Sequence, residues 1–585
     1  MVQEPYVLNL HPYKRGKPCA EDLTQGGADA YGTKERVIVM TKELDISRRS
    51  FLGIGAAAAG VGALGMFGCT PSTPANNESA DEQGQAEASE LAPADSTEEC
   101  DVVVVGMGTS GCVAASAAAR EGAKVIGLDR ANSMAGTNAA NVSGVFAVGS
   151  TPELAEPNAL TVEDMFKFIW EGTHYQSNAP ALRNLLEASG KGMDLMIDAG
   201  VPFMYAFQGA DENTALLNRG GHIYATSGEE RATALQGMMD SFGVDSRWEC
   251  EATNLLVEDG KVVGVRYTAS DSSTVDIKAK NVIVATGGFM QNEEMLRKYY
   301  AGGLMYGPGN LYNDGAGINM AIAAGAQIGK NFSTSINESG ACNMKSSVRF
   351  VSLTDCNETP VLSMPLFGGL FVNRMGDRFL DEGKMAKQTM YCGEPLLREG
   401  RYYAIVDQGF VDQLASNPAR DFITDDAFTN MAPNVQMGFE GKTMSSLPDQ
   451  LELGIEEGWV WRADTFEELA EAASLANLAT TAEAYNGYCQ NGHDDEMFKE
   501  AQFLRELAEG PFYAIELEAA AWVTLGGIKT DGHCRAVNAD SQPIEGLFIA
   551  GVDGDFWAVP YFQGGSCQGF CVASGYLAGV TAAQA

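Results

Sequence analysis

The sequence predicts an α/β fold in which helices cover a mostly parallel sheet. Three stretches support this. Residues 101–129 form a short β-branched strand, a glycine-rich turn, an alanine-rich helix and a second strand that ends on an acid. Residues 281–289 and 543–551 are two more apolar strands, and each ends in glycine. Strands that alternate with helices in this way are typical of a doubly wound sheet.

The turn after the first strand has the spacing of a phosphate-binding loop. Gly106 allows the tight turn, Gly108 lets the backbone approach a pyrophosphate, and Gly111 lets the helix pack on the strand. Phosphates would bind the free N–H groups at the helix N-terminus, where the helix dipole favours anions. Contacts from Thr109 and Ser110 are expected for the same reason.

An acid follows the second strand at the position that a nucleotide site needs. Asp129 lies about 18 residues after the last glycine of the turn, where its carboxylate can accept from ribose hydroxyls. A glycine turn alone is weak evidence. With both strands, the helix and the acid in place, the sequence predicts a nucleotide-binding unit.

Size and charge exclude some classes of protein. The 585 residues are too many for one simple core, so two domains with appendages are expected. A net charge of −38 is evidence against nucleic acid as a partner, because little could neutralise its phosphates. The 12 cysteines are scattered, with no CxxC or CxxCH pattern. We therefore expect no metal site, and cysteines that are simply buried or joined in a few disulfides.

The N-terminal part predicts an exported protein. Residues 1–39 show little periodicity, whereas residues 40–69 contain Arg48-Arg49, then Phe51-Leu52 and a Gly/Ala-rich apolar run. This is a twin-arginine export signal, and the run is a poor transmembrane helix. Because such signals lie near the start of a protein, we expect Met40 to be the true start and residues 1–39 to be an over-extended reading of the gene.

The signal ends in a possible lipid attachment site. Cys69 follows a small residue, as in a lipoprotein processing site, although Met66 and Phe67 depart from the usual pattern. Residues 70–99 are acidic and rich in Ser, Pro and Ala, so we expect a disordered tether with a reach of roughly 30 Å. The prediction is an extracytoplasmic protein held at the membrane surface through Cys69. A cleaved, freely soluble exported protein is the alternative.

Further motifs follow along the chain and complete a recognisable set. They are Ala285–Phe289, Asp314-Gly315, Gly369–Asn373, Gly376–Phe379, Tyr485-Asn486, Gly526–Asp531 and Gly546–Gly551. Together with the glycine turn, they resemble the flavoprotein family of fumarate reductases, which also holds urocanate reductase and 3-ketosteroid Δ1-dehydrogenase. The resemblance covers about residues 100–585.

The resemblance implies non-covalent FAD in a discontinuous Rossmann-like domain, residues 100–330 and 510–585, with an inserted α+β cap or substrate domain, residues 331–509. The implied FAD contacts are Gly106, Gly108, Thr109, Ser110, Gly111, Asp129, Arg130, Gly136, Thr137, Asn138, Ser143, Gly144, Ala252, Ala285, Thr286, Gly287, Asp314, Gly551, Gly565, Ser566 and Cys567. The family usually has Glu at position 129, and its acid after Gly551 is Val552 here.

The source of electrons is expected to be another protein. The chain has one credible nucleotide fingerprint, so a second site for NADH is not expected. The haem and covalent-FMN modules of some relatives are also absent from the sequence. We therefore expect an external donor, a cytochrome or a quinol-linked protein.

The substrate contacts of the resembled family are changed. Reducing an activated C=C needs a hydride, a proton donor and groups that polarise the conjugated carbonyl. Fumarate reductases use arginines and a histidine, and those positions fall on Pro365, Ala386, Val523 and Phe562. A buried dicarboxylate without cationic partners would be badly desolvated. The expected small-molecule substrate is therefore less charged, such as an aromatic or cyclic enone.

Three residues are candidates for the missing catalytic groups. Tyr561 could donate a proton, although it could also pack in an aromatic cluster. His222 could reach the flavin face, although a structural histidine is the simpler interpretation. Arg349 lies near the sequence position at which a relative has a substrate-binding histidine, although loop arginines are usually solvated.

Three functions remain open from the sequence. The first is an exported FAD-dependent oxidoreductase that reduces a conjugated C=C. The second is a ketone or steroid dehydrogenase that runs the chemistry in the opposite direction, with Tyr561 helping enolisation. The third is a non-catalytic tethered flavoprotein that carries electrons, which the loss of the cationic contacts suggests.

Overall fold

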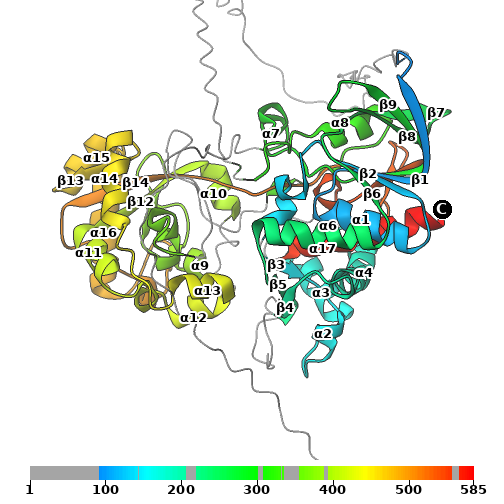
Figure 1. The fold of residues 1–585 in the computed structure, drawn as a ribbon. Helices are drawn as coiled ribbons and strands as arrows, with labels where there is room; N and C mark the ends of the chain where they lie inside the picture. The colour runs from blue at the N-terminus through cyan, green and yellow to red at the C-terminus, as the bar shows by residue number, and fades with distance from the viewer. Residues whose placement is uncertain are drawn as a thin grey trace, which may run out of the picture. The chain divides into compact units, whose positions relative to one another are not determined.

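The computed structural model describes residues 91–142, 144–205, 219–300, 307, 309–330, 332–334, 355–387, 393–431, 433–556 and 565–585. They fall within one compact unit, Glu90–Ala585. The predicted export signal, its lipid site and residues 1–39 lie outside the described residues. Figure 1 shows the elements described below.

The central sheet confirms the predicted α/β class. Its strand order is β16-β17-β9-β1-β2-β6, and β8 pairs with both β9 and β7. The strands are β1 (Ser96–Val105), β2 (Val125–Leu128), β6 (Asp245–Arg247), β7 (Glu251–Glu258), β8 (Lys261–Thr268), β9 (Thr274–Val284), β16 (Arg535–Val537) and β17 (Pro543–Ile549). The ladder from β17 through β9, β1 and β2 to β6 is parallel throughout. Segments from both ends of the chain therefore build one sheet.

The strands form where the sequence predicts them, for the expected reasons. Val102, Val103 and Val104 are fully buried, as β-branched side chains on both faces of a central strand must be. The β7–β8 hairpin turns at Asp259-Gly260, and both residues have positive φ angles of 50° and 77°. A two-residue hairpin turn needs this geometry.

The start of β1 corrects the predicted tether. Ser96–Glu99 were expected to be disordered, but they pair with Val275–Lys278 of β9. Asp95 also accepts a hydrogen bond of 2.8 Å from the backbone N–H of Thr274. Backbone pairing along a neighbouring strand orders this polar segment although it has few apolar side chains to bury.

Helix α1 (Thr109–Arg120) packs closely against α17 (Ser566–Gln584), and α17 also packs on α4 (Ala179–Asp198). Figure 1 shows α1, α6 (Gly228–Ser241) and α17 close together at the sheet. A Cβ atom at Gly575 or Gly579 would clash with the carbonyl oxygens of α1. These glycines let the two helix backbones approach each other.

Smaller elements complete this part of the chain. Three strands form an antiparallel sheet in the order β3-β5-β4. The elements are β3 (Gly144–Phe146), β4 (Phe203–Tyr205), β5 (Gly221–Tyr224), α2 (Thr151–Leu154), α3 (Val162–Gly172), α7 (Glu293–Tyr299), α8 (Ala316–Ala323), and the paired β10 (Ser333–Thr334) and β15 (Thr524–Leu525).

The inserted region is α+β, as predicted. Its antiparallel sheet has the order β11-β12-β14-β13. The elements are β11 (Leu370–Val372), β12 (Arg401–Asp407), β13 (Val460–Ala463), β14 (Phe512–Glu518), α9 (Glu382–Lys387), α10 (Gly393–Glu399), α11 (Gln408–Ser416), α12 (Asp425–Asn430), α13 (Pro433–Phe439), α14 (Leu447–Glu457), α15 (Phe466–Ala473) and α16 (Leu478–Asn491). The predicted cap ends at residue 509, so β14 was expected in the FAD-binding domain. In the structure β14 pairs with β12 and β13 of the cap sheet. The cap sheet therefore extends through Glu518.

A fully buried ion cluster lies in the cap. The Nη2 atom of Arg378 is 2.7 Å from Glu382 and 2.8 Å from Asp494, and Lys499 Nζ is 3.4 Å from Glu382. All four side chains have no exposed surface, and their charges sum to zero. Lys499 also donates to the hydroxyl of Tyr485 at 2.9 Å. Burial raises the pKa of Asp494, but the hydrogen bonds from Arg378 outweigh it and hold that pKa well below its usual range.

Three further features concern the described residues alone. Their eight cysteines are free thiols, and six of these are buried. No group of three or more His, Cys, Asp or Glu side chains in these ranges could hold a metal ion. No helix in them combines the length and the apolar character needed to cross a bilayer.

We predict that Glu382→Gln destabilises the protein by about 3–5 kcal/mol, because it leaves two buried cations with a single buried carboxylate. Urea unfolding of the flavin-loaded protein measures the change. The matched control is Glu187→Gln, which breaks an exposed helical pair with Arg183 and should cost less than about 0.5 kcal/mol. Equal losses of unfolding free energy in the two variants would contradict the conclusion that the buried cluster stabilises the protein.

Candidate functional site

The ends of three parallel strands meet at one edge of the central sheet. The N–H of Ala285 donates to Val105 at 2.8 Å, and the N–H of Ala550 donates to Val284 at 2.9 Å. These bonds align the ends of β1, β9 and β17, so the turns that begin at Gly106, Thr286 and Gly551 lie together. Ligands of open parallel sheets bind outside the carboxyl ends of the strands, and this edge is the candidate site.

The glycine turn has the space that a pyrophosphate requires. Gly106 has a φ of +91°, and a Cβ there would clash with the carbonyl of Ala285. A Cβ at Gly111 would clash with the carbonyl of Gly106. At Gly108, the N-cap of α1, a Cβ would meet no heavy atom of the described chain within 4 Å. The backbone is therefore tight behind the loop and open in front of it.

The start of α17 reaches the same crevice. Gly565 is its N-cap, with a φ of +76°. Its carbonyl accepts from the N–H of Phe146 at 3.0 Å, which brings β3 and Gly144 to the helix start. Ser566 and Cys567 follow in the first turn and are buried. A Cβ at Gly551 would clash with the side chain of Ser110, so the strand end packs directly on the first turn of α1.

Asp129 holds the glycine loop and keeps accepting capacity for a ligand. Its Oδ2 accepts from the N–H of Met107 at 2.7 Å, and its Oδ1 accepts from the N–H of Ala131 at 2.8 Å. A carboxylate oxygen has two lone pairs, so each can accept a second hydrogen bond. Burial raises the pKa of Asp129, while the two backbone bonds act in the opposite direction. The residue stabilises the loop and can bind a ribose hydroxyl.

Arg130 joins three segments beside this acid. Its Nη2 is 2.8 Å from Asp314 and also donates to the carbonyl of Tyr312, and its Nη1 is 3.5 Å from Glu251. Glu251 is the first residue of β7, so its neighbour Ala252 also lies close to Arg130 and Asp314. Burial raises the pKa of Asp314, but the hydrogen bond and charge of Arg130 together with the N–H of Ala316 outweigh it and lower that pKa overall. The structure therefore brings together Arg130, Ala252 and Asp314, three of the residues expected to contact FAD.

The segment after β2 is tied to the loop before α8. Thr137 is buried, and its hydroxyl donates to the carbonyl of Met134 at 2.8 Å. Asn138 Oδ1 accepts from the N–H of Asn310 at 2.6 Å, and the Asn310 side chain donates to the carbonyl of Gly136 at 2.7 Å. Ser143 lies outside the described residues.

Sequence reasoning missed Asp553. The expected acid position after Gly551 holds Val552, but Asp553 is fully buried and accepts from Thr286 Oγ1 at 2.9 Å and from the N–H of Gly288 at 2.7 Å. The N–H of Thr286 also donates to it. Burial raises the pKa of this carboxyl, and the donated bonds offset the rise in part. Asp553 therefore ties the end of β17 to the turn after β9.

The side-chain amide of Asn313 is buried at the crevice and could hydrogen-bond a cofactor there. Its side chain is 4% exposed, and its Nδ2 finds no acceptor in the described part of the chain. A Cβ at Gly287 would lie 2.9 Å from its Oδ1, so the amide lies at the crevice. A buried donor without an acceptor among the described residues is one that a bound cofactor could satisfy. The Asn313-Asp314-Gly315 helix start was noticed in the sequence, but the role of its asparagine was not.

The three catalytic candidates fare differently. His222 is 1% exposed, its Nε2 is 2.8 Å from Ser150 Oγ, and its Nδ1 is 3.0 Å from the carbonyl of Gly220. Burial lowers its pKa, so the structure favours the structural interpretation for this histidine. Tyr561 and Arg349 lie outside the described residues and stay predictions.

Three of the four apolar replacements lie among the described residues, and these three are buried. Pro365 and Ala386 lie in the cap, and Val523 directly precedes β15. Thr524 Oγ1 accepts from the N–H of Phe289 at 3.0 Å, which fixes Val523 near the turn after β9. Val523 belongs to one apolar cluster with Ala285 and Val552. Phe562 lies outside the described residues.

A Rossmann-type crevice with an open phosphate loop, a ribose acid and an orphaned amide defines a dinucleotide-dependent protein. Residues 101–567 match the family described as FAD binding domain, and the chain belongs to that family. It is a flavoprotein oxidoreductase of the fumarate reductase type, acting on CH–CH groups.

Three comparisons illustrate the range of relatives. The chain is 29% identical over 501 residues to vinyl phenol reductase of Lactiplantibacillus plantarum, covering 83% of this chain and 96% of that protein. It is 27% identical over 495 residues to fumarate reductase (cytochrome) of Shewanella frigidimarina, covering 83% and 77%. The fold matches 3-ketosteroid Δ1-dehydrogenase from Sterolibacterium denitrificans with a TM-score of 0.63 at 18% identity, covering 83% of this chain and all of that one.

We predict that Gly108→Val weakens FAD binding about tenfold or more, because its side chain would fill the open space in front of α1. The φ of −66° at this position accommodates valine without strain. Flavin retained through purification and a titration of the apoprotein with FAD measure the effect. Gly237→Val in α6, where a Cβ also meets open space, should keep its flavin. Unchanged FAD affinity in the first variant would contradict the assigned phosphate loop.

Proposed function

We propose that the chain reduces the C=C bond of an uncharged, conjugated aromatic alkene, of the kind that the name vinyl phenol reductase describes. The likeness to that enzyme extends over 96% of its length. The observation that carries the proposal is the apolar character of the positions where the resemblance expects charged substrate contacts. Val523 is 9% exposed and Ala386 is 2% exposed.

The energetics of the apolar positions favour a neutral substrate. Val523, Ala285 and Val552 belong to the same buried apolar core, and Val552 lies beside the turn at Gly288. A carboxylate buried against such side chains would lose its hydration without a compensating cation. An aromatic ring loses nothing comparable and gains from the burial of its apolar surface. The same argument makes fumarate a poor substrate.

The chain and its cofactor divide the chemistry. FAD, when bound, supplies hydride transfer to one carbon of the double bond. The turns at Gly106, Gly288 and Gly551 would hold the cofactor, and Asp553 and Thr524 fix the turn after β9. A proton must still reach the second carbon. We propose Tyr561 as its donor, since it directly precedes Phe562 in the sequence, the position of a family arginine, and its hydroxyl can donate a proton.

We also propose that the protein works outside the cytoplasm and receives electrons from a separate donor. Support comes from Arg48-Arg49, the apolar run and Cys69 in the sequence. The Shewanella relative is a fumarate reductase of the cytochrome type by name, which supports a donor of the cytochrome class. A quinol-linked donor is the alternative.

We expect anaerobic enzyme to oxidise reduced methyl viologen rapidly with 4-vinylphenol and at least about a hundredfold more slowly with fumarate, a difference of about 2.7 kcal/mol in transition-state binding. Loss of viologen absorbance measures both rates. Brisk turnover of fumarate would contradict the proposal. Reduction of an artificial acceptor by a saturated ketosteroid would favour the dehydrogenase instead, and no turnover despite bound FAD would favour an electron carrier.

We predict that Tyr561→Phe lowers kcat about 100-fold or more while KM and flavin content change little, since only the proton donor is lost. Steady-state kinetics with 4-vinylphenol measure the split between kcat and KM. The control is Tyr576→Phe, which removes a hydroxyl that accepts from Arg120 at the surface of α17. A kcat for Tyr561→Phe within about threefold of the wild type would rule out Tyr561 as the donor.

A further inference from the structure

Arg231, near the start of α6, is a buried arginine without a carboxylate partner among the described residues. Two other arginines are buried to a similar degree, and each pairs with a carboxylate: Arg266 with Asp276 and Arg378 with Glu382. Arg231 is 4% exposed. Burial lowers its pKa, yet a guanidinium stays charged in proteins. A buried charge that no acid neutralises is costly, and a bound anion could compensate it.

The guanidinium of Arg231 is fixed by backbone carbonyls and keeps donors to spare. Its Nε donates to the carbonyl of Thr226 at 2.9 Å, its Nη2 donates to the same carbonyl, and its Nη1 donates to the carbonyl of Val142. Its central carbon lies 4.2 Å from the ring centre of Tyr224, so the ring covers one flat face. A guanidinium has five N–H groups, and the two that remain have no acceptor within the described ranges.

Two hydroxyls without partners belong to residues that touch this guanidinium. Tyr224 is 4% exposed, and neither its hydroxyl nor that of Thr226 finds a partner in the described part of the chain. Burial and then the thiols of Cys112 and Cys571 raise the pKa of Tyr224, so its hydroxyl stays protonated and can donate. One buried cation and two hydroxyl donors together are the groups that an anion requires.

The backbone around Arg231 places this donor set beside the cofactor crevice. Its partner Val142 comes two residues before Gly144, an expected FAD contact. Helix α6 packs on the short turns Met134–Gly136 and Asn138–Ala140, which contain or adjoin further expected contacts. The arginine therefore lies against the segments that the cofactor is expected to touch.

Tyr224 lies near both helices whose starts reach the crevice. Cys112 belongs to α1 and Cys571 to α17, and both thiols are close enough to Tyr224 to influence its titration. The Sγ atom of Cys571 would lie 3.8 Å from a Cβ placed on Gly551, where β17 ends. The phenol is therefore close to the region where the two helix starts and the strand end meet.

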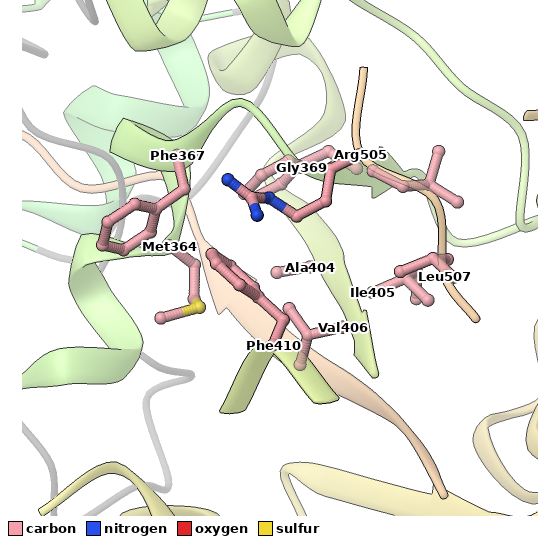
Figure 2. A pocket seen from close by; sticks show the side chains of 11 residues that line it. Met364, Phe367, Gly369, Ala404, Ile405, Val406, Phe410, Arg505 and Leu507 are labelled. Atoms are coloured by element: carbon pink, nitrogen blue, oxygen red, sulfur yellow. The ribbon is translucent and has the colours of Figure 1, made fainter. Parts of the chain in front are cut away.

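A cavity in the cap does not provide a comparable anion site. Figure 2 shows it with Arg505 and apolar walls that include Met364 and Phe367. Its volume is about 10 Å³, which is room for about one water molecule. Arg505 is partly exposed, so water can satisfy its N–H groups. Arg231 is nearly inaccessible to solvent, and water cannot replace an anion there in the same way.

We propose that Arg231, Tyr224 and Thr226 form a side-chain half of the site for the FAD pyrophosphate. The glycine turn and the start of α1 supply backbone N–H groups with only partial charges. The guanidinium would add a full charge, and its spare N–H groups and the two hydroxyls would donate to phosphate oxygens. The net charge of −38 gives an anionic cofactor no long-range attraction, so a local cation matters for its affinity.

The inference concerns cofactor binding and holds whichever alkene the enzyme reduces. Its test can therefore use the release of FAD from the flavin-loaded protein, followed by the rise in flavin fluorescence on dilution. Tyr224→Phe should raise the Kd for FAD about tenfold or more, because it removes a donor to a charged group. Arg231→Met should raise that Kd at least about thirtyfold, and Arg231→Lys should raise it less because the charge is kept.

The matched control is Thr530→Val. Thr530 is 3% exposed, its hydroxyl also has no partner among the described residues, and its backbone pairs with Ala536 of β16. The Kd of this variant for FAD should equal that of the wild type. The ³¹P spectrum of bound FAD gives a readout that a change in packing far from the phosphates does not move. At least one phosphorus resonance should shift in Tyr224→Phe, and neither should shift in Thr530→Val.

A Kd for FAD within about threefold of the wild type in Tyr224→Phe would overturn the proposal. Unchanged phosphorus resonances in that variant would overturn it as well, even if its affinity fell, because the loss would then arise away from the phosphates. Tyr224→Phe removes only an unpaired hydroxyl and keeps the ring that packs on Arg231. It therefore decides the outcome even where Arg231→Met fails to fold.

Discussion

The convergence of three strand ends and two helix starts at one edge of the sheet is the constraint on which the site depends. Backbone groups must approach both each other and a pyrophosphate, so side chains are excluded at Gly106 and Gly551. Asp553 then joins the end of β17 to the turn after β9 through three donated hydrogen bonds. The cofactor crevice exists because segments about 250 residues apart in sequence are pinned at the same place.

Buried charged side chains are present in the cap, whereas apolar side chains occupy the expected substrate-contact positions at the cofactor crevice. In the cap, Arg378 and Lys499 are buried, and each lies beside a carboxylate at hydrogen-bonding or ion-pair distance. At the crevice, the described Val523 is an apolar side chain at a position where the resembled family has a charged substrate contact. Buried charge is tolerated where it is paired and absent where it would be unpaired, as desolvation requires.

Sequence reasoning succeeded where the signal is local. The glycine turn and the main strands follow from periodicity and turn chemistry, and the structure has both. It failed where long-range pairing overrides composition. Ser96–Glu99 are polar but extend β1 along β9, and β14 belongs to the cap sheet although it follows the expected boundary. Asp553 was missed because its partners, Thr286 and Gly288, are remote in the chain.

The sequence by itself determined the cofactor class, the parallel α/β core and the loss of the family's charged substrate contacts, because each is encoded in short motifs whose chemistry is local. The tertiary structure alone decided that His222 is satisfied within the fold, that the Asn313 amide is left without an acceptor in the described chain, and that Arg505 lines a small cavity. These properties depend on which distant groups meet. A hydrogen-bond partner or a cavity wall is set by packing, and residue spacing along the chain does not specify it.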